Sequence, residues 1–372
     1  MTTDELGEGL ESADSPCRRS VTVGIVSDDG FASTIAAAIV KSLPAEVYIG
    51  AAPVAVEVVR AAVTLPPTET GLAPVGQWLE SVQSTDTYDV VLCVSEVPRR
   101  YRAKPVIAEL REATAAALYV PSFGTVAVRR RAVRLAIELV HQLLSTDLST
   151  RPRPRRTSST WAPGPDPDRG DRILLTSGFF GRLRLIAGMV RCNRPWRLVP
   201  ALSGALGAAA AASAFGVFYA SIWQMAASMT ATRLAAIAVT AVAAMSAWLI
   251  LPNGLWEFRS SRPSRIDRWM YNGATVGTVV TGVLCMYVVL FCVVAGSATI
   301  VISPEFITAQ IGRPATTGDY VSLAWLAASL GTVAGAVGSS VSDREDILAA
   351  TYGHREMLRR KSAASEEQAD QQ

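Results

Sequence analysis

Four long apolar segments without a single Asp, Glu, Lys, Arg or His lie in the second half of the chain. They cover roughly residues 198–220, 234–251, 275–300 and 320–341. Each is close to or longer than the ~20 residues that a helix needs to cross the hydrocarbon core of a bilayer. Apolar side chains surround each segment instead of forming one stripe, which is typical of helices exposed to lipid. The pattern predicts an integral membrane protein with a four-helix transmembrane domain over residues 196–342.

Arginines are distributed unevenly among the loops around these segments. They are frequent before the first segment, between the second and third, and after the fourth, whereas each of the other two loops holds one, Arg233 and Arg313. The positive-inside rule places the arginine-rich loops in the cytoplasm. We therefore expect a multi-pass plasma-membrane protein with both termini cytoplasmic. The residues expected at the cytoplasmic membrane interface are Arg182, Arg184, Arg191, Arg194, Trp196, Arg197, Trp256 and Trp269.

Hydrophobic positions in the first half follow a different pattern, that of an α/β domain over residues 20–146. Continuous apolar runs at 21–27 and 88–94 predict buried strands of a parallel sheet, and helical spacing predicts amphipathic helices over 31–43 and 126–144. Further strands are expected at 47–51, 55–64, 106–109 and 117–120, and a short helix at 75–84. Strands alternating with helices favour a doubly wound, mostly parallel sheet.

Polar residues follow two of the expected strands, at the edge where such sheets bind ligands. Two interpretations remain open. Ser27, Asp28 or Asp29 would cap the helix that follows the first strand, or the carboxylates would hold Mg²⁺ through oxygen ligands while Arg99 holds an anion. The candidate ligand-binding residues are Asp28, Asp29, Ser95, Glu96 and Arg99.

Other chemistry finds little support in the residues present. A glycine-rich phosphate loop is missing, and the two histidines, His141 and His354, are not spaced to form a triad with a serine or cysteine. The five cysteines show neither paired nor zinc-binding spacing. A formal charge of +3 gives no strongly basic field for nucleic acid. The sequence therefore predicts no catalytic residue, no cofactor, no resident metal and no nucleic-acid partner.

Two segments connect the halves. Residues 147–172 are rich in proline and arginine and predict a linker, because proline at this density excludes helix and sheet. Its arginines at 151–156 either lie on anionic headgroups or stay solvated. Residues 173–195 mix apolar and basic side chains, which predicts an amphipathic helix in the membrane interface; a helix packed on the α/β domain is the alternative.

The two chain ends are polar. Residues 1–19 predict a disordered acidic N-terminus without the pattern of a signal peptide. Residues 343–372 are expected to form a cytoplasmic tail. We therefore expect everything before the first apolar segment to stay on one side of the membrane.

Small residues recur at four-residue spacing in three of the apolar segments, a pattern that lets helix backbones approach closely. They predict either a tightly packed bundle or a seam between copies of the chain. The absence of ionisable residues at depth argues against a coupled transporter, and a neutral pore formed by an oligomer stays open as an interpretation. The first row is Gly204, Ala208, Ala212 and Gly216; the others contain Gly273 and Gly277, and Gly331 and Gly335.

Short motifs beside the apolar segments resemble landmarks of a group of uncharacterised actinobacterial integral membrane proteins. They are Asn193-Arg194-Pro195-Trp196-Arg197, Gly254-Leu255-Trp256-Glu257, Asp319-Tyr320 with Leu323-Ala324-Trp325-Leu326, and Ala350-Thr351-Tyr352-Gly353. The resemblance covers roughly residues 183–360. It implies a shared four-span architecture with a cytoplasmic front domain, and it carries over no catalytic residue because the group has no assigned activity.

These observations together favour a non-enzymatic membrane module. We expect a scaffold or regulator embedded in the lipid bilayer, with a protein partner or a second copy of itself as its binding partner. The alternative is a membrane-anchored ligand sensor or enzyme that uses the pocket at the strand ends.

Overall fold

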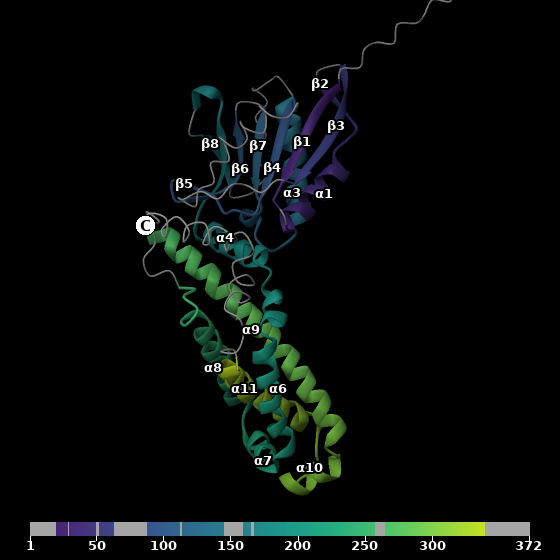
Figure 1. Cartoon of the computed structure of the whole chain (residues 1–372), viewed down its shortest axis with the longest axis vertical. Coiled ribbons are helices and arrows are strands. Elements are labelled where there is room, and N and C mark those ends of the chain that lie inside the picture. The colour runs from purple at the N-terminus through teal and green to yellow at the C-terminus, as the bar shows by residue number, and fades with distance from the viewer. Residues whose placement is uncertain are drawn as a thin grey trace, which may run out of the picture.

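The computed structural model describes residues 20–28, 30–49, 52–62, 88–111, 114–144, 159–164, 167–256 and 265–338. A β-sheet domain occupies one end of the molecule and a group of helices the other, with one short helix, α4, between them (Figure 1). The α/β class predicted for the first half is confirmed, and so is the helical second half.

The sheet is mixed. Among the described residues it contains nine strands, ordered β2-β3-β1-β4-β7-β6-β9-β8, with β5 paired to β6. Strands β3, β1, β4 and β7 run parallel, whereas β2, β6, β8 and β9 pair antiparallel with their neighbours. The strands are β1 (Ser20–Ser27), β2 (Glu46–Ile49), β3 (Ala52–Ala62), β4 (Val90–Ser95), β5 (Arg100–Tyr101), β6 (Lys104–Arg111), β7 (Ala115–Tyr119), β8 (Ser159–Pro163) and β9 (Arg172–Thr176).

The prediction of a doubly wound sheet is wrong. The helices α1 (Phe31–Ser42) and α3 (Val128–Leu144) pack against each other and share one apolar core on the same face of the sheet. Strand β6 ends at Arg111 and β7 begins at Ala115, and a parallel pair requires a crossover of a dozen or more residues. The short connection therefore forces the two strands to be antiparallel. The predicted helix at 75–84 lies outside the described residues.

The segment predicted as a linker, residues 147–172, contains strand β8 and the first residue of β9, and the rest of β9 lies in the segment predicted as an interfacial helix. Strand β8 ends with Pro163 and lies at the edge of the sheet. Proline is tolerated on an edge strand, because the N–H that it lacks is not needed for pairing on the open side. In β9, Ile173 and Leu174 enter the apolar cores on opposite faces. The expectation of a helix from residue 173 is therefore wrong for its first turn. The helix α4 (Phe179–Cys192) begins after Gly178, whose φ of 85° favours glycine.

Three helices in the second half are long and apolar enough to cross a membrane: α8 (Ala231–Ile250), residues Arg268–Val301 of α9 (Arg265–Val301), and α11 (Thr317–Gly338). The stretch Phe179–Ala201 passes the same test only together with α6 (Ser203–Phe218), to which it is bent by 58°. The chain is therefore a membrane-associated protein. The connecting elements are the 3₁₀ turn η3 (Pro195–Arg197), α5 (Leu198–Ala201), α7 (Ala220–Ser228) and α10 (Pro304–Ile311).

Close packing of α6 on α11 forms the centre of the helical half. A Cβ at Gly331 would lie 2.0 Å from Ser213 Oγ, and one at Gly335 would lie 2.9 Å from the carbonyl oxygen of Ala205. The face of α6 in this contact is Ala205, Ala209, Ser213 and Gly216. Part of the predicted row also takes part in this contact: Gly216 is buried against Ala327, and Gly204 and Ala208 lie against Gly338 at the end of α11. Gly273 and Gly277 instead face α4, at Ile186 and Val190.

Candidate site at the junction of the sheet and the helices

Asp28 ties the ends of two central strands together. It follows β1, is 1% exposed, and its Oδ2 accepts hydrogen bonds from Ser95 Oγ and the Glu96 amide, both at 2.8 Å. Its own amide donates to the Val94 carbonyl at 3.1 Å. The structure therefore brings Asp28, Ser95 and Glu96 together at the carboxyl edge of the parallel strands, and Asp29 lies outside the described residues.

Glu96 caps the helix that follows β1. Its Oε1 accepts a hydrogen bond of 2.8 Å from the Ala32 amide in the first turn of α1. Glu96 directly follows the neighbouring strand β4 and is not one of the expected caps Ser27, Asp28 and Asp29, the last of which lies outside the described residues. Burial, above all, raises the pKa of Glu96, and the nearby Asp28 acts in the same direction, while the helix amides and Arg194 oppose it. In the folded protein, Glu96 therefore takes up a proton at a higher pH than an exposed glutamate does.

Arg99 does not join this group. Its guanidinium pairs with Glu109 on β6, whose other carboxylate oxygen accepts a 3.2 Å hydrogen bond from the Tyr119 hydroxyl. Glu109 is 1% exposed, and a carboxylate buried this deeply requires such hydrogen-bond and charge partners. Burial, followed by the Glu109 charge, raises the pKa of Tyr119 well above its usual value and keeps the phenol a neutral donor. Arg99 therefore neutralises a buried carboxylate and does not point to an anion site.

One face of α4 docks on the sheet domain. A Cβ at Gly188 would lie 1.9 Å from the carbonyl oxygen of Pro121 in the 3₁₀ turn η1 (Val120–Phe123). Arg184 donates to Thr176 Oγ1, and Arg191 donates to the Thr125 carbonyl, both at 2.5 Å. These contacts fix the helix to the loops at the carboxyl edge of the strands.

The opposite face of α4 docks on α9. Gly277 accepts the side chain of Val190 so closely that a Cβ there would lie 2.7 Å from Val190 Cγ2. Leu185 and Met189 share a small apolar core with Met270 and Ala274. Asn193 Nδ2 donates to Thr278 Oγ1 at 3.0 Å, which adds a polar contact where α4 ends. The helix α4 therefore joins the two halves of the protein (Figure 1).

The expected interface residues separate into two groups. Trp196, Trp256 and Trp269 are 55%, 38% and 58% exposed, as expected of tryptophans that meet lipid headgroups. Arg182 and Arg197 are exposed as well, whereas Arg184 and Arg191 are turned into the contacts with the sheet domain, and Arg194 lies near Glu96.

The contact residues Glu109, Tyr119 and Gly188 were not singled out from the sequence. The spacing of Gly181 and Gly188, two helical turns apart, could have indicated a close contact on one side of the helix, and in the structure both face the sheet domain. Nothing in the spacing of Glu109 and Tyr119 reveals that they meet across two antiparallel strands.

No protein-family model, curated protein or solved structure matches this chain. Within the described residues, no three His, Cys, Asp or Glu side chains lie close enough together to hold a metal ion.

Proposed function

We propose that this chain is a multi-pass plasma-membrane protein that acts as a non-enzymatic scaffold or regulator, with the sheet domain as the module that a partner engages. The observation that carries the proposal is the double docking of α4, which holds the sheet domain on the helices through close contacts at Gly188 and Gly277. A domain fixed in this way moves together with the membrane helices, as coupling between a membrane anchor and a cytoplasmic module requires.

The use of the polar residues at the strand ends supports a non-enzymatic role. Asp28 Oδ2 already accepts two hydrogen bonds, and Glu96 is engaged with the first turn of α1. Their contacts stabilise the junction of β1, β4 and α1. These contacts favour a structural role for Asp28, Ser95 and Glu96 over a ligand pocket, although the helix cap comes from Glu96. A ligand sensor at this edge stays the alternative.

The proposed topology has four spans and cytoplasmic termini. The bent pair that ends in α6 would be the first span, and α8, α9 and α11 the others. The arginine distribution supports this orientation. In the first turn of α11, Asp319 accepts hydrogen bonds from both terminal nitrogens of Arg313 and from the Thr316 amide. Pairing at this position neutralises the one carboxylate that precedes the apolar part of the helix.

Reporter fusions test this topology. Fusions at Thr230 and Thr316 are expected to report the outside, and fusions at Ser264 and Ala364 the inside, because arginine-rich loops stay in the cytoplasm. Alkaline phosphatase and a cytoplasmic fluorescent reporter at each position give opposite signals. A cytoplasmic signal at Thr316 would contradict the four-span proposal.

Affinity capture of the full chain from native membranes tests the scaffold role. We expect the wild-type chain to retain a specific partner protein, and the Gly188→Ala variant to retain less of it because the sheet domain is held less firmly on α4. The Gly207→Ala variant, at a position with open space around it, serves as the matched control and should retain the partner. Repeated recovery of the wild-type chain alone would refute a scaffold function.

A further inference from the structure

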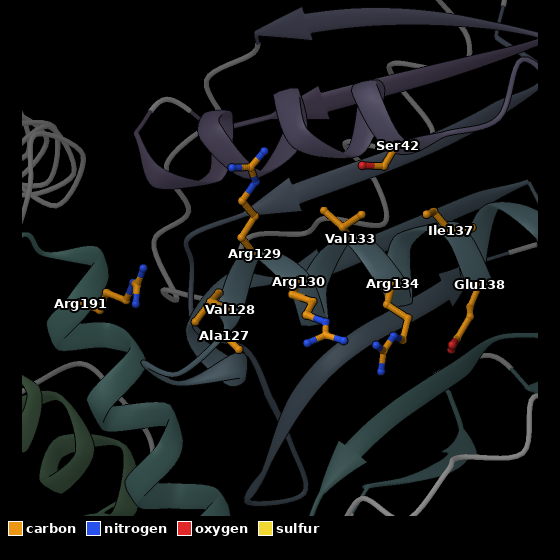
Figure 2. Close-up of a pocket in the computed structure, with 10 residues that line it drawn as sticks. All are labelled: Ser42, Ala127, Val128, Arg129, Arg130, Val133, Arg134, Ile137, Glu138 and Arg191. Atoms are coloured by element: carbon orange, nitrogen blue, oxygen red, sulfur yellow. The ribbon is translucent and has the colours of Figure 1, made fainter.

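A strongly basic groove runs along the outer side of α3. It has a volume of about 810 Å³, and four arginines line it, Arg129, Arg130 and Arg134 from α3 and Arg191 from α4, against one carboxylate, Glu138. In Figure 2, Arg130 and Arg134 extend to the same side of α3 and Arg191 lies at the end of the groove where α3 begins. Cationic side chains from two separate elements therefore line one hollow, with Arg129 on the other side of α3 from Arg130 and Arg134.

The α3 arginines have no anionic partner in the part of the chain that the structure describes. Arg129, Arg130 and Arg134 are exposed, and none of them forms a hydrogen bond or ion pair with another described residue. Arg130 and Arg134 are four residues apart on one helix, a spacing at which like charges repel. The first turn of α3 also contains no acidic residue, so positive side chains add to the positive end of the helix dipole. An anion in the groove would relieve both repulsions.

One end of the groove, at Arg191 and Ala127, lies where the sheet domain meets α4, and the groove continues along α3 to Ile137 and Glu138. Arg191 belongs to the last turn of α4, a few residues before Pro195 and the first proposed span. Val126, in the loop that leads into α3, is 76% exposed, and Trp196 is 55% exposed. An exposed apolar side chain at the start of α3 and an exposed tryptophan just after α4 are typical of a surface that meets the headgroup layer of a bilayer.

We propose that this groove binds the phosphate group of an anionic phospholipid, and that the lipid thereby holds the sheet domain against the cytoplasmic leaflet. Guanidinium groups match the geometry of phosphate oxygens and donate two parallel hydrogen bonds to them. The position of Arg191 next to the first span favours a lipid over a soluble phosphate as the source of that group. The proposal relies on the membrane location of the helices and is independent of the scaffold function.

The experiment uses the full chain in nanodiscs made either of phosphatidylcholine alone or of an equal mixture with phosphatidylglycerol. Bound phosphatidylglycerol is counted by native mass spectrometry, and thermal melting is followed in both nanodiscs. We expect phosphatidylglycerol to raise the melting temperature of the wild-type chain. In the R130Q/R134Q variant the apparent affinity should fall by about 30-fold, because each basic residue near an anionic surface contributes roughly a factor of five.

Two controls keep the outcome decisive. The R102Q/K104Q variant removes two exposed charges from the turn between β5 and β6, at the same edge of the sheet but outside the groove, and should bind phosphatidylglycerol like the wild-type chain. In phosphatidylcholine alone, the R130Q/R134Q variant should melt no lower than the wild-type chain, because a repulsive pair has been removed.

Three results would overturn the proposal. Equal losses in both double variants would mean a general attraction to the surface. A lower melting temperature of R130Q/R134Q in neutral nanodiscs would mean a structural role for these arginines. If inorganic phosphate stabilised the wild-type chain in neutral nanodiscs as much as phosphatidylglycerol does, the groove would be a site for a soluble anion.

Discussion

The replacement of Gly188 by alanine is expected to loosen the sheet domain from the membrane helices. A Cβ at this position would lie 1.9 Å from the Pro121 carbonyl oxygen, a backbone atom that no change of rotamer can move away. Alanine gains up to about 1 kcal/mol of helix propensity over glycine, but overpacking against a fixed neighbour costs about 1–3 kcal/mol. The clash should prevail, with a net loss of about 1–2 kcal/mol.

Hydrogen exchange of the full chain in detergent measures this effect. Deuterium uptake should increase in α4 and in the 3₁₀ turn at Val120–Phe123, while the contact between α6 and α11 stays protected. The Gly296→Ala variant, in α9 with open space around it, is the control and should leave exchange in both regions unchanged. Identical exchange in the Gly188→Ala and wild-type chains would show that α4 is not clamped at this position.

The replacement of Gly331 by leucine should destabilise the membrane half more strongly. The new side chain would enter the space occupied by Ser213, whose Oγ would lie 2.0 Å from the added Cβ, and would displace the hydrogen bond of 3.1 Å from Ser213 to the Ala327 carbonyl. Helix pairs in membranes depend on such close backbone approach. We expect a loss of about 3 kcal/mol from overpacking and the disrupted hydrogen bond together.

Melting in detergent at several protein concentrations distinguishes helix packing within one chain from a seam between copies of the chain. Because Gly331 faces α6 of the same chain, the melting temperature should fall by the same amount at every concentration. The Val333→Leu variant enlarges a side chain on the same helix that is 47% exposed, and it should melt like the wild-type chain. A loss of cross-linked oligomer without a change in melting would instead place this glycine between copies.

The local hydrophobic pattern was sufficient to predict the central strands and their helices. The segments that form β1 and β4 are buried along most of their lengths, and α3 has an apolar stripe on one side. In these elements the order of apolar and polar residues along the chain follows directly from which positions are buried. The pairing of β6 with β9 could not be predicted from the local pattern, because it joins segments that are more than 60 residues apart in the sequence. Such pairing depends on tertiary contacts that a local pattern does not record.

The packing face of α6 illustrates a different limit. Nearly every residue from Ser203 to Ser213 is glycine, alanine or serine, so rows of small residues exist on all sides of the helix. The sequence predicts that a close contact forms but does not say on which face, and the observed row is offset from the predicted one by a single residue over most of its length. For Gly273 and Gly277 the row itself was predicted, and only its partner helix, α4, was not.

The helix α9 is long enough that a change in its tilt would move the contact with α4. At 37 residues, this helix is about 55 Å long, well beyond the ~30 Å thickness of a hydrocarbon core. Its contact with α4 near Gly273 and Gly277 lies roughly 20 Å from the middle of its apolar part. Helices adjust their tilt to bilayer thickness, and at that radius a change of about 10° displaces the contact by about 3–4 Å. We expect α9 to act as a lever that converts bilayer thickness into movement of the sheet domain.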